Sequence, residues 1–302
     1  MMQLPGIALA DWRGQSRVFS FNGFAIRYWT AGPQTRAGAA APEPLLLIHG
    51  FPTAAWDWHY LWQPLSERYQ LIACDMLGFG DSAKPRPHTY SLLEQADLQQ
   101  ALLAHLQIST PVHVLAHDYG DSVAQELLAR HYEARIALAS CVFLNGGLFP
   151  ETHQPVLLQK LLLTPLGPLL AGLFKRPTLA RNLRRIFGPA SQPTELELDS
   201  FWSLIVSHNG QAVLPLLIRY MPERRVQRER WLAAMQGDEV PLRLIDGGLD
   251  PISGAHMLAR YRELIPNADC ILLENVGHYP QIEAPVQVLQ HYLQFRQHLT
   301  DR

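Results

Sequence analysis

The sequence predicts an α/β protein built on one mostly parallel, doubly wound sheet of about eight strands. Short, continuous apolar runs recur along the chain, as expected of strands that are buried on both faces. Stretches with helical periodicity alternate with these runs, and parallel strands need such crossover connections. Right-handed crossovers place helices on both faces of the sheet.

Eight segments are expected to form strands. The first two, "VFSF" and "FAIRYWTA", flank Asn22-Gly23, a dipeptide typical of a tight hairpin turn. The other expected strands are 45–49, 70–75, 112–116, 139–145, 241–247 and 268–274. The expected helices are 91–106, 121–134, 254–264 and 282–298.

The segment between "ASCVFLN" and "PLRLIDG" breaks this alternation, because it is rich in Leu, Arg and Pro and contains no clear strand. We interpret residues 148–238 as an inserted helical cap, and residues 1–147 and 239–302 as the core domain. Insertions in open α/β sheets lie at the carboxyl ends of strands, where ligands bind.

The composition argues against several classes of function. Of the 302 residues, 48% are hydrophobic and 17% are charged, a balance that supports a sizeable core. The net charge of -2 gives no electrostatic reason to expect nucleic-acid binding. We therefore interpret the basic clusters "RNLRR" and "PERRVQRER" as solvated helix faces.

No cofactor or metal is expected, because the sequence has neither a glycine-rich phosphate loop nor a cluster of metal ligands. Cys74, Cys141 and Cys270 lie in or beside apolar runs and are expected to be buried, reduced thiols. The amino-terminal stretch lacks the pattern of a signal peptide, so we expect a cytoplasmic protein. The apolar stretch 156–174 is interpreted as cap core and pocket wall, with weak membrane association as the alternative, and the oligomeric state is left open.

Four motifs follow predicted strands: "HGFP" (49–52), "HDYGD" around Asp118, "GGLDP" with Asp250, and "NVGHYPQIEAP" with His278. The order of nucleophile, acid and histidine is that of a large group of hydrolases with a catalytic triad. Asp118 by itself also fits a simple helix N-cap. Because His278 and Asp250 follow in order, we favour a triad in which Asp118 is the nucleophile.

The residue types indicate a two-step hydrolysis. A carboxylate needs no base to attack a saturated carbon, and the product is an ester on Asp118. His278 then activates water to hydrolyse that ester, while Asp250 orients the imidazole. The backbone N–H groups of Phe51 and Tyr119 are the expected oxyanion donors.

Several neighbouring residues are weighed against these roles. Asp246 is a second candidate for the acid, but it falls at the end of a predicted strand, so Asp250 is favoured. Asn145 occupies another position suited to the acid, where it can only form hydrogen bonds. His117 and His49 are interpreted as structural residues, the second as a brace for the oxyanion loop.

The motifs "HGFP", "DMLGFGDSAKP", "HDYGD" and "VGHYPQIEAP" resemble those of the epoxide hydrolase and haloalkane dehalogenase branch of the α/β-hydrolase superfamily. The stretches "HDYGDSVAQELLARHYEA" and "NGGLFPETHQPVLLQKLL" look like the mesoderm-specific transcript protein family. The resemblance implies an α/β-hydrolase fold, a helical cap over the site and an alkyl-enzyme ester on Asp118.

The resemblance leaves the leaving group open. Epoxide hydrolases use cap tyrosines as proton donors, and Tyr220 falls near one such position, although 150–200 contains no second tyrosine. Haloalkane dehalogenases usually place tryptophan after the nucleophile, and asparagine or tryptophan after "HG". This chain has Tyr119 and Phe51 there, which puts a halide cradle in doubt.

We therefore expect hydrolysis of an epoxide on a hydrophobic small molecule. Haloalkane or haloacid dehalogenation is the first alternative, and a lipophilic ligand-binding or membrane-associated protein is the second. Trp56 and Trp202 are expected either to line an apolar pocket or to pack in the core.

Overall fold

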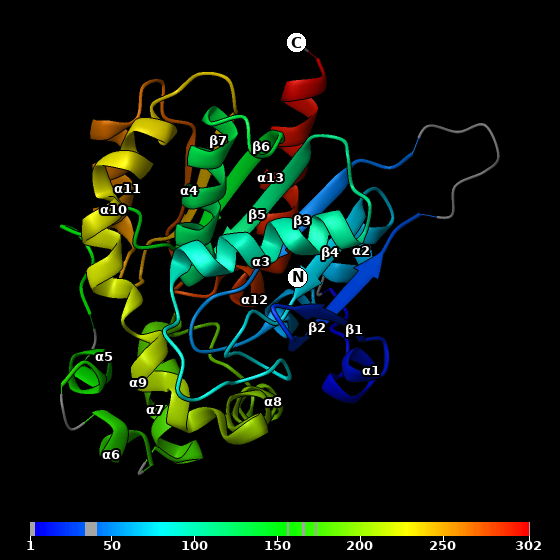
Figure 1. The fold of residues 1–302 in the computed structure, drawn as a ribbon. Coiled ribbons are helices and arrows are strands. Elements are labelled where there is room, and N and C mark those ends of the chain that lie inside the picture. The colour runs from blue at the N-terminus through cyan, green and yellow to red at the C-terminus, as the bar shows by residue number, and fades with distance from the viewer. Residues whose placement is uncertain (1–3, 34–40, 156, 165–166, 173, 302) are drawn as a thin grey trace.

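An eight-stranded sheet lies at the centre of the computed structural model, which describes residues 4–33, 41–155, 157–164, 167–172 and 174–301 (Figure 1). The strand order is β1-β2-β4-β3-β5-β6-β7-β8, and only the pairs β1·β2 and β2·β4 are antiparallel. The strands are β1 (Arg17–Phe21), β2 (Phe24–Ala31), β3 (Pro44–Ile48), β4 (Gln70–Cys74), β5 (Val112–His117), β6 (Leu138–Leu144), β7 (Leu242–Gly247) and β8 (Cys270–Leu273). The predicted fold class is confirmed, and each predicted strand lies within two residues of an observed one.

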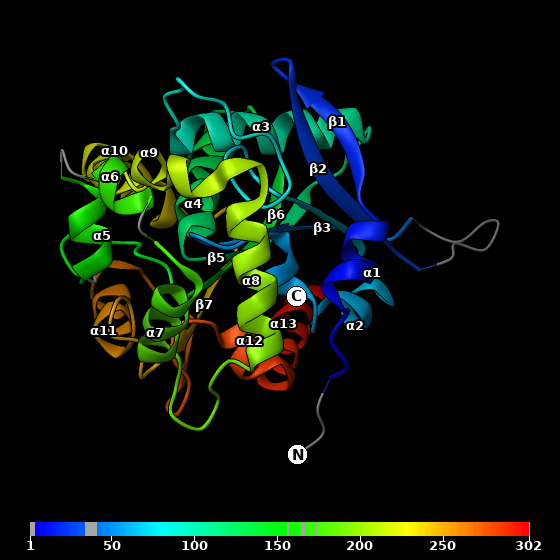
Figure 2. The same cartoon turned by 90° about the horizontal axis from the view of Figure 1, so that it is seen from below.

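Helices cover both faces of the sheet. Figure 2 shows α3 (Leu92–His105), α4 (Tyr119–Tyr132) and α11 (Ala255–Leu264) on one side, and α13 (Pro285–Thr300) on the other. The remaining helices outside the β6–β7 connection are α1 (Leu9–Gly14), η1 (Ala55–Trp58), α2 (Trp62–Ser66) and α12 (Pro280–Glu283). The predicted single helix 282–298 is wrong in one respect, because Ala284 has a non-helical backbone and a new helix begins at Pro285.

The described residues between β6 and β7 form helices and no strand. These helices are α5 (Leu157–Leu162), α6 (Gly167–Gly172), α7 (Arg176–Ile186), α8 (Glu195–Val206), η2 (Ser207–Val213), α9 (Leu214–Leu217) and α10 (Tyr220–Met235). Figure 1 shows α5 to α9 gathered at one end of the sheet, whereas α10 packs along α4. The division of the chain into a core and a cap stays a prediction.

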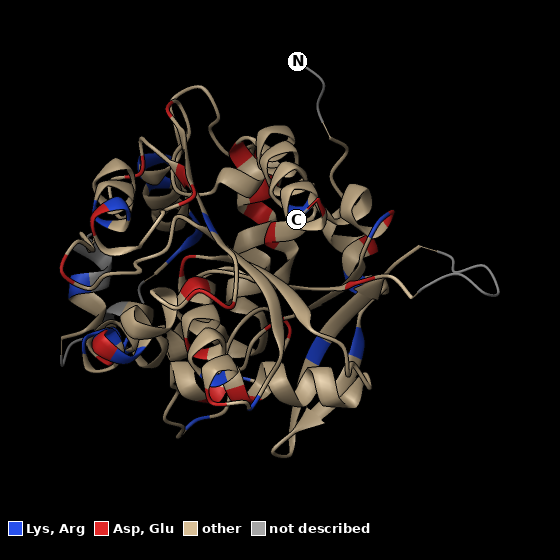
Figure 3. Ribbon diagram, turned by 90° about the horizontal axis from the view of Figure 1, so that it is seen from above, with Lys and Arg blue, Asp and Glu red and all other residues tan. Residues whose placement is uncertain are grey.

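Apolar residues lie mainly inside the protein, as they do in other packed globular proteins. Basic and acidic residues are interspersed along the ribbon (Figure 3). Within the described ranges no single helix is long and apolar enough to cross a bilayer. One bent pair, Glu195–Leu217 with Tyr220–Met235, passes that test by length and composition. Tyr220 and Trp231 of this pair are buried inside the protein.

The three cysteines do not share one environment. Cys74 and Cys141 are buried, as predicted, but Cys270 is partly exposed. The expectation for Cys270 was wrong because β8 is the edge strand of the sheet, so its residues are covered less completely than those of the inner strands.

The strand order creates a switch point between β3 and β5. From β3 the chain moves outward to β4, and it then crosses back to place β5 on the other side of β3. Ligands of open α/β sheets bind beyond the carboxyl ends of strands at such a point. Because Ile48 pairs with Ala116, and His117 with Leu144, the loops that follow β3, β5 and β6 meet there.

A close approach between α4 and β3 fixes the geometry of these loops. A Cβ atom on Gly120 would overlap the carbonyl oxygen of Ile48 and lie 2.7 Å from that of His49. Any other residue at position 120 would therefore push the start of α4 away from the loop after β3.

We expect Gly120→Ala to lower the free energy of unfolding by about 1–3 kcal/mol, the usual cost of overpacking. Gly14→Ala is the matched control, because no atom lies within 4 Å of its added methyl group. That variant should be unchanged or up to about 1 kcal/mol more stable. Urea unfolding of the two variants measures the difference, and equal stabilities would contradict the steric account.

Candidate active site

Asp118 occupies a sharp corner between β5 and α4. Its φ of 47° and ψ of -105° lie outside the regions that non-glycine residues normally adopt. Such a conformation costs on the order of 1–3 kcal/mol and is concentrated at functional sites. The side chain is 2% exposed and does not cap the helix. The N-cap interpretation of its side chain is therefore wrong.

Backbone donors surround the Asp118 carboxylate. The N–H of Phe51 donates to Oδ2 of Asp118 over 3.0 Å. Tyr119 is the first residue of α4, where backbone N–H groups have no partner inside the helix. The structure thus places both predicted oxyanion donors at the same corner, Phe51 in the loop after β3 and Tyr119 at the start of α4.

His278 and Asp250 form a close pair in the loops after β8 and β7. Nδ1 of His278 lies 2.7 Å from Oδ2 of Asp250. The same carboxylate accepts hydrogen bonds from Nδ2 of Asn145, from the N–H groups of Ile252 and Ser253, and from the Ser253 hydroxyl. These donors hold Asp250 in one orientation, which in turn orients the imidazole.

Asp246, the other candidate for the acid, has a different environment. Its side chain is fully buried, and its carboxyl oxygens have no hydrogen-bond partner among the residues that the structure describes. Burial raises the pKa of Asp246 well above its ordinary value, and the negative charges of Asp250 and Asp121 raise it further. A protonated carboxyl cannot supply the charge that a protonated His278 requires, so the geometry favours Asp250.

Two further histidines brace the corner. Nε2 of His49 accepts the N–H of Met76, and its Nδ1 donates to the carbonyl of Gly50 over 2.9 Å. Nε2 of His117 donates to the carbonyl of His278 over 2.7 Å. Burial lowers the pKa of His49 to about 4 and that of His117 to about 3, so both rings are neutral at pH 7.

The charges of Asp118 and His278 stabilise each other. Burial alone raises the pKa of Asp118, but the positive charges of His278 and Arg224 outweigh burial and the net shift is downward. Burial lowers the pKa of His278, but the negative charges of Asp250 and Asp118 outweigh burial and raise it to about 9. At pH 7 the site therefore contains an ionised Asp118 and a protonated His278.

Helix α10 brings two residues to this corner. The ring of Tyr220 lies 6.0 Å from that of Phe51 and 5.0 Å from that of Tyr119. The Tyr220 hydroxyl is buried and has no partner among the described residues. Arg224 is 2% exposed; its Nη2 donates to the main-chain oxygen of Asp118 over 3.0 Å and lies 3.8 Å from Oδ1.

Arg224 is an exception to the interpretation of "PERRVQRER" as a solvated helix face, whereas Arg225 and Glu229 of the same stretch are exposed as predicted. Its Nε donates to the Ser122 hydroxyl over 2.6 Å, so α10 is fastened to α4 by a buried guanidinium. The sequence did contain a signal: Tyr220, Arg224, Trp231 and Met235 recur with helical spacing, and all four are buried. Apolar and aromatic neighbours on the same face place Arg224 inside the protein.

The two tryptophans expected near the pocket lie in different settings. Trp56 is buried, its ring stacks on His59 at 4.0 Å, and its Nε1 donates to the carbonyl of Ile7. Trp202 is partly buried on α8 and lies 5.9 Å from Phe174. No contact of either ring with Asp118 is among the described interactions, and their role as pocket walls stays a prediction.

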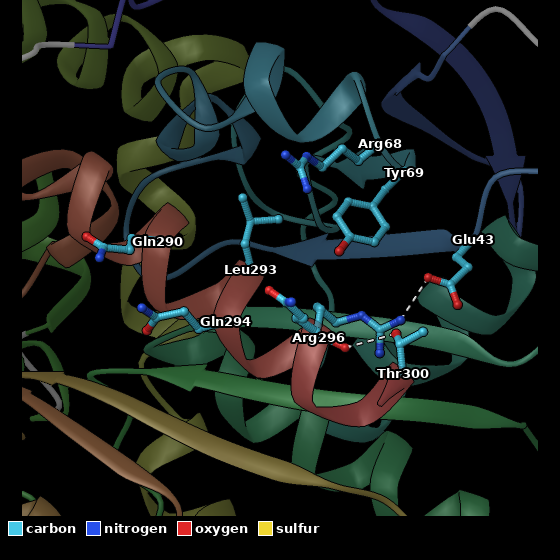
Figure 4. Close-up of a pocket in the computed structure, with 9 residues that line it drawn as sticks. Glu43, Arg68, Tyr69, Gln290, Leu293, Gln294, Arg296 and Thr300 are labelled. Atoms are coloured by element: carbon cyan, nitrogen blue, oxygen red, sulfur yellow. Dashed lines mark hydrogen bonds and ion pairs between the residues drawn. The ribbon is translucent and has the colours of Figure 1, made fainter. Parts of the chain in front are cut away.

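A separate hollow lies at the amino ends of the strands, opposite the end where Asp118 lies. Figure 4 shows it between α13 and the residues that precede β3 and β4, with Arg296 paired to Glu43 over 2.7 Å. Glu43 and Tyr69 lie at the amino ends of these strands, whereas Asp118 follows the carboxyl end of β5. In the described part of the chain, no group of three or more His, Cys, Asp or Glu side chains is arranged to hold a metal ion.

Comparisons with known proteins agree with this architecture. A sequence model of the alpha/beta hydrolase fold family matches residues 43–285. The chain is 40% identical to the mesoderm-specific transcript protein of Mus musculus over 298 residues, which cover 95% of this chain and 88% of that protein. It is 39% identical over 252 residues to LipZ of Mycobacterium tuberculosis, which is named as a hydrolase; the match covers 83% of this chain and 87% of LipZ.

Solved structures with low sequence identity share the fold. A haloalkane dehalogenase variant from Bradyrhizobium elkanii has a TM-score of 0.77 at 20% identity, covering 95% of this chain and 97% of its own. The epoxide hydrolase CorEH has a TM-score of 0.74 at 22% identity, covering 93% of this chain and 97% of its own.

The coupling of charges predicts how the pKa of His278 responds to substitution. Asp118→Asn and Asp250→Asn each remove a negative charge that raises this pKa, so we expect each variant to lower it from about 9 by at least about one unit. Asp246→Asn is the matched control and should leave it unchanged, because a protonated Asp246 carries no charge. Histidine ring NMR titrations measure all three, and a lowered pKa in the control would overturn the assignment of the acid.

Proposed function

The chain belongs to the α/β-hydrolase fold family and is a relative of the mesoderm-specific transcript proteins; from this premise we propose that it opens an epoxide on an apolar small molecule through an ester on Asp118. The observation that carries the proposal is an aspartate at the strained corner between β5 and α4, held by the Phe51 N–H and electrostatically coupled to the His278–Asp250 pair. A serine nucleophile would need a neutral histidine to take its proton, whereas a carboxylate needs none.

In the first step Asp118 attacks a ring carbon. Its Oδ2 is held by the Phe51 N–H, so Oδ1, on the side of Arg224, is the attacking oxygen. A carbon–oxygen bond forms as the ring carbon–oxygen bond breaks, and the ring oxygen takes a proton from the Tyr220 hydroxyl. The tyrosinate then recovers a proton from His278, whose pKa falls because esterification removes the charge of Asp118.

In the second step the neutral His278 takes a proton from water, and the water oxygen attacks the ester carbonyl carbon. The N–H groups of Phe51 and Tyr119 stabilise the resulting oxyanion, and such donors are worth about 3–4 kcal/mol each. The intermediate collapses, the departing alcohol oxygen receives the proton of the new carboxyl group, and a diol leaves. Asp118 is again ionised and His278 protonated, so the cycle closes.

We expect a single turnover in ¹⁸O-labelled water to place the label in the peptide that carries Asp118, because water attacks the ester carbonyl carbon. In His278→Gln the ester should accumulate, since the hydrolysis step loses a base worth about 10²–10⁴-fold in rate. Peptide mass analysis detects both results. An unlabelled Asp118 peptide after turnover would rule out the ester.

The role of Tyr220 has its own test. Tyr220→Phe should slow ester formation by about 10²–10⁴-fold, because the ring oxygen loses its proton donor. Tyr261→Phe is the matched control: its hydroxyl is also buried without a partner among the described residues, but it lies on α11. Rapid-quench measurements of ester formation compare the two, and equal rates in both variants would remove Tyr220 from the mechanism.

Dehalogenation is the competing reaction, because a carboxylate also displaces halide from a saturated carbon. The proposal predicts diol formation from epoxides and little halide release from a panel of haloalkanes and haloacids. Halide release faster than diol formation would assign the site to dehalogenation and leave the ester on Asp118 in place.

A further inference from the structure

The guanidinium of Arg224 has more hydrogen-bond donors than partners. Arginine carries five N–H groups. Nε donates to Ser122 and Nη2 to the carbonyl of Asp118, whereas Nη1 is buried and has no partner among the residues that the structure describes. A buried charge with unused donors is costly unless a partner reaches it.

Nη1 points to a second group without partners. A Cβ atom on Gly147 would overlap Nη1 of Arg224 and lie 2.9 Å from Nδ1 of His153. Both nitrogens therefore lie close to the backbone of Gly147. Both ring nitrogens of His153 are buried and unpartnered within the described ranges. A neutral imidazole can donate one N–H, and burial lowers the pKa of His153 to about 3.

We propose that Arg224 and His153 form an oxyanion-binding subsite, and that the substrate is an electrophile with a carboxylate next to its reactive carbon. This substrate class rests on the proposed function. The carboxylate accepts hydrogen bonds from Nη1 of Arg224 and from the His153 ring. Only 3.8 Å separates Nη2 of Arg224 from Oδ1 of Asp118, so the carboxylate is attached to the reactive carbon or to its neighbour.

The position of Asp118 explains why the subsite also favours the reaction. Among the described residues, Asp118 supplies the one carboxylate within 4.0 Å of the Arg224 guanidinium. Asp121, beside Gly146, is a nearby carboxyl group, but burial raises its pKa well above its ordinary value, so it carries no charge. Two further carboxylates are engaged elsewhere: Glu223 accepts the N–H of Leu92, and Glu126 pairs with Arg130. When Asp118 becomes an ester it loses its charge, and the guanidinium then attracts the substrate carboxylate more strongly. Such an interaction, stronger after attack than before it, accelerates the chemical step.

Two other charged groups near the subsite affect how strongly it binds a carboxylate. Asp250 is paired with His278, and Asp118 repels a second carboxylate until it reacts. Nη2 of Arg224 faces Asp118 while Nη1 faces Gly147, so the guanidinium lies between the two negative charges and screens them from each other. The Arg224 guanidinium also lies over the Tyr220 ring, 4.4 Å from its centroid, while the Tyr220 hydroxyl serves the ring oxygen.

Binding of unreactive ligands tests the subsite without any turnover. We expect the wild-type protein to bind 3-phenylpropanoate about 10–100-fold more tightly than the neutral 3-phenylpropanamide, the usual value of a hydrogen bond to a charged group. Arg224→Gln should abolish the preference, and Arg225→Gln, at an exposed position of the same helix, should keep it. Isothermal titration calorimetry measures these affinities. Equal affinities for the two ligands in the wild-type protein would overturn the proposal, whether or not the variants fold.

Turnover distinguishes the carboxylate from the leaving oxygen. With 3-phenylglycidate and 3-phenylglycidamide as matched epoxides, Arg224→Gln should lower kcat/KM for both, because Arg224 also holds Asp118, but the loss should be about 10–100-fold larger for the carboxylate than for the amide. An equal loss for both substrates would overturn the subsite. If the wild-type protein opens neither epoxide but keeps the Arg224-dependent preference in calorimetry, the subsite stands and epoxide hydrolysis fails.

Discussion

The burial of an ionised carboxylate at Asp118 is the constraint on which the rest of the site depends. A carboxylate taken out of water costs several kcal/mol unless charges and hydrogen bonds replace its hydration. Here the Phe51 N–H, the amino end of α4, the protonated His278 and the Arg224 guanidinium replace it. Each comes from a different segment, so the fold has to bring all four to one point.

The sheet and α10 achieve this in different ways. The switch point between β3 and β5 places the Phe51 loop beside Asp118, and the absence of a side chain on Gly120 lets α4 start against β3. Helix α10 is held beside Asp118 by Arg224, which donates hydrogen bonds to the Ser122 hydroxyl and to the Asp118 carbonyl. Arg224 therefore both holds Asp118 in place and fastens α10 to α4.

The charges that stabilise the site also allow His278 to be protonated in one state and neutral in another. Asp250 and the ionised Asp118 together keep His278 protonated, and in the proposed mechanism the esterification of Asp118 lowers the pKa of His278 and releases this proton. A histidine that begins as an acid and becomes a base suits a reaction in which a leaving oxygen first needs a proton and a water molecule later has to lose one. This change in the pKa of His278 requires no conformational change, because it follows from the charge of Asp118.

The strands, most helices outside the β6–β7 connection and the order of the candidate residues were determined by the sequence itself, because apolar runs, helical spacing and residues after strands are local patterns. Asp118, Asp250, His278 and Tyr220 could be named as candidates in this way, and their catalytic roles stay predictions. The helical spacing of Tyr220, Trp231 and Met235 indicates that Arg224 is buried, but the partners of Arg224 and His153 could not be predicted, because they depend on contacts across the fold; Arg224 lies 106 residues from the carbonyl that it binds. Charge alone predicts that a basic helix turns its arginines outward, because burying a charge is costly. The tertiary structure reverses that expectation because the carboxylate of Asp118 is already buried there and stabilises a cation beside it.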